Sequence, residues 1–104
     1  MRIREGREAE YRELHAQRNP LGDGIREACR RAGFRNYSLF TGGPTGNWVF
    51  GYFETDDLDT SIASLGADPA NDAWQAMVTP LMELPATFAD SDEVTLLAEV
   101  FHLE

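Results

Sequence analysis

The stretch FRNYSLFTGGPTGNWVFGYFE, residues 34–54, contains two strand-forming runs around a glycine-rich turn. Residues 34–41 and 48–54 are rich in aromatic side chains, which favour an extended backbone. Residues 42–46 between them read GGPTG, and they lack the lysine and the following helix that a phosphate-binding loop needs. The stretch therefore predicts an antiparallel β-hairpin.

Before the hairpin, the pattern predicts a short strand and two helical pieces. Residues 1–4 are compatible with a strand, and an amphipathic helix is expected from Arg7 onward. Proline and glycine in residues 19–24 are expected to interrupt that helix. We expect Asp23 to cap a second helical piece over residues 24–32.

After the hairpin, the pattern predicts two more helical runs, a loop and a final strand. The two aspartates at residues 56–57 suit a helix N-terminus. A further helix is expected over residues 69–82, bent or interrupted at Pro80. Residues 85–92 form a polar stretch that predicts a loop, and the alternating pattern of residues 94–103 predicts the last strand.

The expected elements follow the order β-α-β-β-α-β, which is typical of the ferredoxin-like fold. We expect an α+β protein with a four-stranded antiparallel sheet that carries its helices on one face. A chain of 104 residues suits a single domain over residues 1–104. The open face of that sheet would be too aromatic to remain in water, which predicts a homodimer through this face.

Composition excludes several classes of partner and location. The chain has 18 acidic and 9 basic side chains, a net charge of −9, which disfavours nucleic acid and anionic membrane surfaces. The single cysteine, Cys29, cannot form an internal disulfide. Residues 1–5 show no apolar signal-peptide core, and glycines and a proline break the longest uncharged stretch, residues 36–53. A cytoplasmic protein is expected.

Tyr11 and His15 are the most informative candidate site residues. They lie one helical turn apart, so their side chains project from the same face of the predicted helix. Imidazole exchanges a proton near neutral pH, and a neighbouring phenol can hold or relay a hydrogen bond. The spacing alone also fits a buried structural histidine packed against a tyrosine, so at this point both interpretations stand.

The other candidate residues fit structural roles. Cys29 lies among apolar helix positions and is expected to be a buried small hydrophobe rather than a nucleophile. Trp48 and Trp74 are more typical of a small core than of sugar-stacking walls, and His102 is expected to be structural. The two histidines have no metal-binding spacing, so we expect no metal site.

The arrangement of several motifs resembles the L-rhamnose mutarotase family over almost the whole chain. The Tyr-x-x-x-His pair and the C-terminal Glu-Val-Phe-His-Leu are the most specific of these motifs. The motifs are Tyr11-Arg12-Glu13-Leu14-His15, Asn36-Tyr37, Trp74-Gln75-Ala76-Met77 and Glu99-Val100-Phe101-His102-Leu103.

The resemblance implies a dimeric α+β barrel of ferredoxin-like protomers that interconverts the α and β anomers of L-rhamnose without a cofactor. It matches His15 to the catalytic proton donor, with Tyr11 beside it, and matches Tyr11, Tyr37 and Trp74 to substrate-binding positions. Ala73 stands where the family usually has a first tryptophan, so one wall of the sugar pocket is expected to be missing.

A small neutral 6-deoxy sugar is thus the expected substrate, and L-rhamnose, L-fucose and related sugars remain open. Opening the sugar ring requires a base for the anomeric hydroxyl and an acid for the ring oxygen. Two alternatives stand beside the mutarotase. One is a cofactor-free monooxygenase of the same dimeric fold, and the other is a non-catalytic sugar-binding module.

Overall fold

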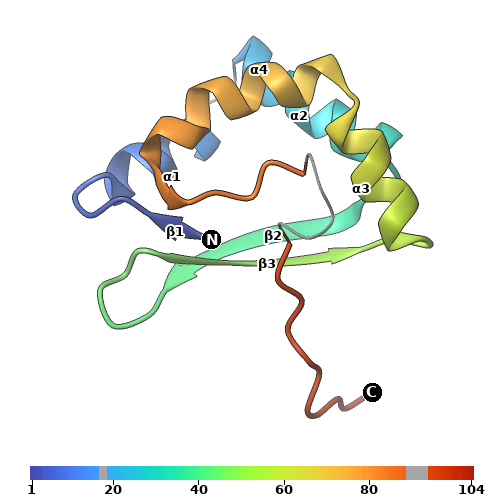
Figure 1. The fold of residues 1–104 in the computed structure, drawn as a ribbon. Coiled ribbons are helices and arrows are strands. Elements are labelled where there is room, and N and C mark those ends of the chain that lie inside the picture. Colours follow the sequence, from blue (N-terminus) through green and yellow to red (C-terminus); the bar gives the residue numbers. More distant parts are fainter. Residues whose placement is uncertain (17–18, 89–93) are drawn as a thin grey trace.

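The structure, a computed structural model, describes residues 1–16, 19–88 and 94–104. Its helices and strands alternate in a pattern close to the one expected (Figure 1). In chain order the elements are β1 (Arg2–Ile3), α1 (Glu8–Ala16), α2 (Pro20–Arg31), β2 (Arg35–Gly42), β3 (Trp48–Glu54), α3 (Leu58–Gly66), α4 (Pro69–Val78), the 3-10 turn η1 (Thr79–Leu81) and β4 (Met82–Leu84).

Within the described residues, four strands form one antiparallel sheet in the order β2-β3-β1-β4. This order is the one expected for the ferredoxin-like arrangement, and the predicted α+β class is confirmed. The longest pairing joins β2 and β3, where Phe40 lies opposite Phe50 and Gly42 opposite Trp48. The predicted hairpin therefore forms the centre and one edge of the sheet.

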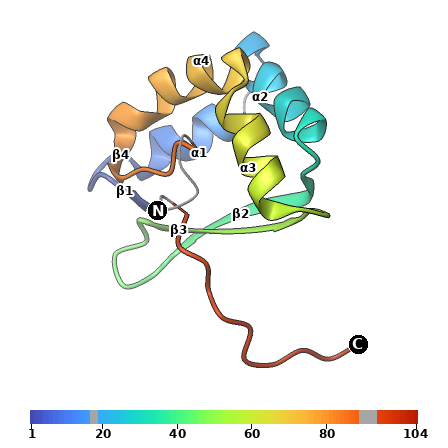
Figure 2. The same ribbon diagram turned by 45° about the vertical axis from the view of Figure 1, so that its right-hand side comes forward.

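The helices cover one face of the sheet and leave the other face open (Figures 1 and 2). Side chains alternate accordingly: Ile3 and Val49 are buried beneath the helices, whereas Phe40, Phe50 and Tyr52 are exposed on the open face. The name open face is used below for the sheet surface that carries Phe40, Phe50 and Tyr52. No helix in the described part of the chain combines the length and the apolar character that crossing a membrane requires.

The turn of the hairpin depends on glycine. Gly43 and Gly46 have positive φ angles of 86° and 73°, which glycine adopts at little cost. A Cβ atom at Gly43 would lie 2.6 Å from Cδ1 of Trp48, so a larger residue would displace that ring. The glycine cluster therefore closes the hairpin, as expected.

Helix α2 begins earlier than the sequence pattern suggests. The first helix ends at Ala16 and a separate helix begins at Pro20, so the expected break is confirmed, but residues 20–24 lie in α2 and the expected cap at Asp23 is wrong. Asn19 is the cap instead, and its side chain accepts a hydrogen bond of 2.8 Å from the backbone N–H of Gly22. Pro20 occupies the first position of the helix. Its missing N–H costs no intrahelical hydrogen bond there, and its fixed φ already suits a helix. Gly33 ends this helical region with a φ of 93°, as expected.

The second half of the chain agrees with its expected helix starts but not with the expected length of the last helix. Asp57 caps α3, accepting a 3.0 Å hydrogen bond from the N–H of Thr60. Helix α4 ends at Val78, because Pro80 lies in the 3-10 turn that follows and cannot continue the α-helical ladder. Met82 then enters β4 rather than extending the helix.

The expected strand over residues 94–103 is wrong. Residues 94–104 form no helix or strand, and the fourth strand of the sheet is Met82–Leu84 instead. A strand needs a neighbouring edge for its backbone hydrogen bonds, and β4 already occupies the free side of β1. The predicted loop is described only over residues 85–88, which contain no helix or strand, and Asp90-Ser91-Asp92 lie outside the described residues.

Candidate active site

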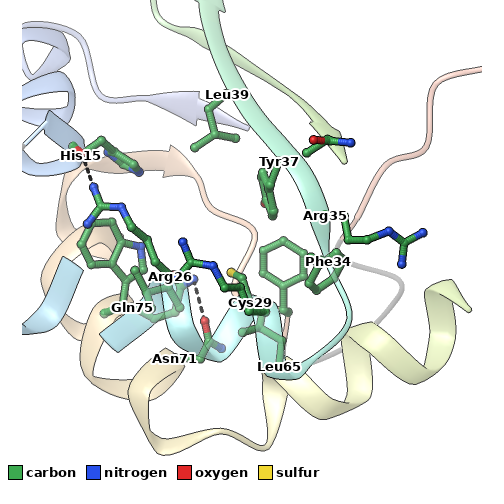
Figure 3. Close-up of a pocket in the computed structure, with 15 residues that line it drawn as sticks. His15, Arg26, Cys29, Phe34, Arg35, Tyr37, Leu39, Leu65, Asn71 and Gln75 are labelled. Atoms are coloured by element: carbon green, nitrogen blue, oxygen red, sulfur yellow. Dashed lines mark hydrogen bonds between the residues drawn. The ribbon is translucent and has the colours of Figure 1, made fainter. Parts of the chain in front are cut away.

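A pocket of about 760 Å³ opens between the helical layer and β2 (Figure 3). It lies where two hydrophobic clusters meet, since Trp74 belongs to one cluster and Phe34, Leu65 and Phe88 belong to the other. The side chains that matter for chemistry come from four elements: His15 from α1, Arg26 and Cys29 from α2, Tyr37 and Leu39 from β2, and Trp74 from α4.

His15 lines this pocket, and among the described residues only its Nδ1 atom has a hydrogen-bond partner. Its Nδ1 atom lies 2.8 Å from the backbone carbonyl oxygen of Tyr11. A carbonyl oxygen can only accept, so the neutral ring carries its proton on Nδ1 and donates it to Tyr11. The Nε2 atom is left with an unshared electron pair, and this tautomer can take a proton from a bound hydroxyl group.

Burial lowers the pKa of His15 below its ordinary value of 6.5. The hydrogen bond to the Tyr11 carbonyl opposes this effect, and the positive charge of Arg26 adds to it. The imidazole is consequently neutral at neutral pH, which is the state in which Nε2 can act as a base.

Two aromatic rings hold the imidazole in place. The Tyr11 ring is tilted against it with ring centroids 4.3 Å apart, and Trp74 meets it edge-on at 5.1 Å. Tyr11 is only 4% exposed and does not line the pocket, whereas Trp74 does. Burial raises the pKa of Tyr11 to about 12, so its phenol stays neutral. The structure therefore places Tyr11 behind His15 and Trp74 beside it.

Tyr37 lines the opposite side of the pocket, from β2 (Figure 3). The register between β2 and β3 shifts between Arg35 and Ser38, and Asn36 within this bulge has a left-handed φ of 48°. The Asn36 amide donates a 2.6 Å hydrogen bond to the Glu54 carboxylate across the hairpin. Bulges of this kind redirect the side chains around them. Burial raises the pKa of Tyr37, so its hydroxyl remains available as a hydrogen-bond donor.

Sequence reasoning did not find Arg26, which reaches the site from α2. Its Nη2 donates a 3.0 Å hydrogen bond to the backbone carbonyl oxygen of His15, in the last turn of α1 (Figure 3). This bond ties the second helix to the end of the first. The signal was present: Arg26, Cys29 and Arg30 share one face of α2 by helical spacing, and all three line the pocket.

A chain of polar side chains along α4 was missed as well. Thr79 lies 3.4 Å from the side-chain oxygen of Gln75, the Gln75 amide donates to the Asn71 side-chain oxygen at 3.4 Å, and Asn71 donates to the Thr87 carbonyl oxygen at 2.9 Å. Asn71 is 3% exposed. Asn71 and Gln75 lie one helical turn apart on the face of α4 that also carries Trp74. This spacing could have indicated that the three residues form one wall of a pocket.

The remaining candidate residues lie as follows. Cys29 is half-buried in the pocket wall, and burial raises the pKa of its thiol to about 11, which suits a packing role rather than a nucleophile. Trp48 lies on β3 beyond the pocket lining, with the Arg2 guanidinium 5.2 Å from its ring centroid. Ala73 is exposed on α4 and is not among the residues that line the pocket. His102 is exposed.

Among the described residues, no three His, Cys, Asp or Glu side chains are grouped closely enough to hold a metal ion. The side chains that line the pocket include one imidazole, one neutral phenol, an indole, amides and guanidinium groups. Such a set can bind hydroxyl groups and move a single proton.

The chain is similar in sequence to known proteins. A family model described as L-rhamnose mutarotase matches residues 1–103. The chain belongs to the L-rhamnose mutarotase family. A protein of Ligilactobacillus salivarius (strain UCC118) named L-rhamnose mutarotase is 35% identical to it over 96 residues, which cover 91% of this chain and 84% of that relative. As a member of the L-rhamnose mutarotase family, the chain is an isomerase.

Proposed function

We propose that this protein interconverts the α and β anomers of L-rhamnose or a closely related 6-deoxy hexose, without a cofactor. The observation that carries the proposal is His15 in the lining of a pocket that also has an indole and a phenol in its walls, with its Nδ1 bonded to the Tyr11 carbonyl oxygen so that Nε2 carries no proton. Family membership and the name of the relative from Ligilactobacillus salivarius support the reaction class and the sugar.

The reaction requires a group on the protein that can accept a proton and then donate it. A cyclic sugar opens when the anomeric hydroxyl loses its proton, the ring C1–O bond breaks, and the ring oxygen gains a proton. The free aldehyde group rotates about the neighbouring carbon–carbon bond, and the ring closes again on either face of the carbonyl. A positioned acid–base group typically accelerates such a step by about 10²–10⁴-fold.

We assign both proton movements to His15. Neutral Nε2 takes the proton from the anomeric hydroxyl, and the electron pair left on that oxygen forms the C1 carbonyl as the ring bond breaks. The resulting imidazolium donates the same proton to the ring oxygen, which makes His15 the proton donor of the opening step. Ring closure reverses these transfers, so the enzyme returns to its starting protonation state.

The sugar is held by aromatic and polar side chains around the imidazole. Trp74 offers an apolar surface for the C–H face and the methyl group of a 6-deoxy sugar. Tyr37 supplies a neutral hydroxyl for the ring hydroxyl groups. We propose that Tyr11 acts with His15 as a positioning residue, because its carbonyl fixes the tautomer and its ring packs on the imidazole.

We further propose a cytoplasmic homodimer that forms through the open face. Phe40, Phe50 and Tyr52 are 58%, 44% and 56% exposed there, and contiguous exposed aromatic side chains are typical of association surfaces. A neutral sugar needs no electrostatic steering, so the net charge of −9 serves solubility.

The test is magnetisation exchange between the two anomers of L-rhamnose, measured by NMR at one enzyme concentration. Wild-type protein should accelerate exchange, and His15→Ala should lose about 10²–10⁴-fold of that acceleration. Arg12→Ala, on the exposed side of the same helix, is the matched control. Exchange that is unchanged in His15→Ala would refute the assignment. Binding of the sugar without exchange would indicate a sugar-binding module, and oxygen uptake with a polyphenol would indicate a monooxygenase.

A further inference from the structure

The pocket is positively charged although the chain as a whole is acidic. Three of the nine basic side chains line it, namely Arg26, Arg30 and Arg35. The sequence has 18 acidic residues, yet no Asp or Glu of the described part of the chain lines the pocket. A cleft lined by one sign of charge focuses its field on the bound ligand. A neutral sugar does not use this field, so the charge indicates a second class of ligand.

Arg26 and Arg30 are the two arginines that can act on one ligand. They lie one helical turn apart, so both project from the face of α2 that lines the pocket. Like charges at this spacing repel each other, and an anion bound by both removes the repulsion. Arg35 differs, because it bonds to Asp56 at 3.0 Å and Figure 3 shows its guanidinium directed away from Tyr37.

The carboxylates that pair with these two arginines are weak competitors for an anion. Asp23 lies 3.5 Å from the Arg26 guanidinium, and Glu27 bonds to Arg30. All four side chains are at least 36% exposed, and ion pairs exposed to this extent contribute little to stability. A guanidinium has five N–H donors, which is more than these bonds use. A ligand anion can therefore bind without first breaking a strong ion pair.

Arg26 lies at the end of the pocket that the proposed function assigns to the sugar. Its Nη2 donates a 3.0 Å hydrogen bond to the backbone carbonyl oxygen of His15 (Figure 3). The imidazole of the same residue packs against Trp74, with ring centroids 5.1 Å apart. The volume of about 760 Å³ exceeds what one monosaccharide occupies, so space remains beside the sugar ring. A charged substituent on that ring can thus reach the arginines.

We propose that this pocket also binds an aldose that carries a phosphate or carboxylate group, with the anion on Arg26 and Arg30 and the ring beside His15. Planar guanidinium groups bind both oxyanions through paired N–H bonds. The place of the ring rests on the function proposed above. An anionic sugar of this kind competes with neutral L-rhamnose. It is opened and closed in the same way when its anomeric hydroxyl is free, and it only inhibits when that oxygen is substituted.

The first test compares ligands that differ in charge alone. L-rhamnose 1-phosphate and methyl L-rhamnoside share the ring and the substituted anomeric oxygen. Titration calorimetry at low salt should show that the phosphate binds about 10- to 100-fold more tightly, because it gains hydrogen bonds to charged groups. This advantage should shrink as salt is added. Equal dissociation constants for the two ligands would overturn the inference.

Two further ligands distinguish the sources of the anion. Glucuronate that binds more tightly than glucose would extend the site to carboxylates, whereas an advantage confined to L-rhamnose 1-phosphate would assign it to phosphate esters. Inorganic phosphate should bind more weakly than the sugar phosphate, because it lacks the ring. Inorganic phosphate that binds equally tightly would contradict a site that holds ring and anion together.

The second test changes the charge of the α2 wall. Arg26→Gln and Arg30→Gln should each reduce the advantage of the sugar phosphate about tenfold. Arg30 is exposed, so the fold should persist in its variant even if the loss of the Arg26 bond to α1 disturbs the other. Glu27→Gln should act in the opposite direction and strengthen binding. Arg31→Gln is the control, because Arg31 binds Asp68. An advantage that survives in both pocket variants would refute the site.

The inference and the proposed function fail in different ways. Calorimetry needs no turnover, so a wild-type protein that does not exchange anomers would end the proposed function and leave the binding comparison decisive. His15→Ala should be slow in anomer exchange yet keep the advantage of the sugar phosphate. In the active wild type, L-rhamnose 1-phosphate should inhibit exchange of L-rhamnose competitively. Exchange that is unaffected at tenfold its dissociation constant would show that the anion binds outside this pocket.

Discussion

The Nδ1 atom of His15 lies 2.8 Å from the carbonyl oxygen of Tyr11, one helical turn earlier in α1. This single hydrogen bond sets the tautomer of the imidazole, because the carbonyl accepts the Nδ1 proton and leaves Nε2 free. The packed rings of Tyr11 and Trp74 prevent the imidazole from turning away. A helix backbone and two aromatic side chains thus position the proposed proton-transfer group before any sugar binds.

The acid limb of the pH–rate profile should lie below pH 6.5. The pKa of His15 is lowered from 6.5 by burial, and only the neutral ring can take the anomeric proton. Acceleration of anomer exchange should therefore be constant at neutral pH and fall as the pH falls through this lowered pKa. The measurement is the NMR exchange rate from pH 4.5 to 8, with the buffer-catalysed rate subtracted at each pH. Acceleration that increases toward acid would contradict a neutral base.

Arg26→Gln should move this acid limb to higher pH. The Arg26 charge contributes to the lowered pKa of His15, so its removal makes protonation of the imidazole easier. Burial has the larger effect, and the shift should therefore be modest. Arg31→Gln, whose guanidinium instead binds Asp68, is the control. A midpoint that stays in place in both variants would show that Arg26 does not influence the imidazole.

Tyr11→Ala should cost stability as well as activity. Tyr11 is 4% exposed and packs in the core with Ile3, Val49 and Trp74. Removing a buried aromatic ring of this size usually lowers the free energy of unfolding by about 3–5 kcal/mol. Urea denaturation followed by circular dichroism measures the change. Arg12→Ala should stay within about 0.5 kcal/mol of wild type, and a Tyr11→Ala protein equally stable would show that the ring contributes no core packing.

Trp74→Phe should reduce the preference for 6-deoxy sugars. The indole is proposed to contact the sugar methyl group, and a smaller ring provides less apolar surface there. Discrimination of one such group by an apolar wall amounts to about 1–3 kcal/mol, so the ratio of kcat/KM for L-rhamnose over L-mannose should fall toward one. Met77→Leu, on the same helix, is the control. An unchanged ratio would place the methyl group elsewhere in the pocket.

Asn36→Ala should be less stable than Asn36→Gly. Both variants lose the hydrogen bond to Glu54, but only alanine must place a Cβ atom in the left-handed conformation at φ 48°. The expected difference in the free energy of unfolding is about 1 kcal/mol. Thermal unfolding of the two variants side by side gives the comparison. Equal stability would mean that the bulge relaxes, in which case KM for the sugar should rise because Tyr37 moves.

The sequence predicts the hairpin and most of the helices because local chemistry specifies them. Glycines with positive φ define the turn, and Asp57 caps its helix. Local rules mislead at residues 20–24, where proline and glycine suggest that the break continues. A proline directly after the Asn19 cap is instead a helix start, and the glycines fit inside the helix, where a Cβ atom added to Gly24 would lie 3.8 Å from Cβ of Ala70 in α4.

The final strand was not predictable from local pattern alone. Residues 94–103 have the alternation of a strand, but within one chain β4 already pairs with β1, and the alternation cannot specify which edge a strand will use. The same distinction between local pattern and tertiary contact applies to the residues of the site. Spacing along one helix identifies the Tyr11 and His15 pair, whereas Arg26 bonds to the His15 carbonyl, and Tyr37 lines the same pocket, only because separate elements come together.

The alternation of β2 has a consequence for how this gene can change over time. Tyr37 and Leu39 face the pocket, while Phe40, between neighbours of the opposite orientation, faces away from the helices. Substitutions can therefore alter the proposed sugar recognition and the proposed self-association separately. A single-codon insertion or deletion within the strand would exchange the two sets of side chains at once. Length changes should accordingly be tolerated in the glycine turn and eliminated from the strand beside it.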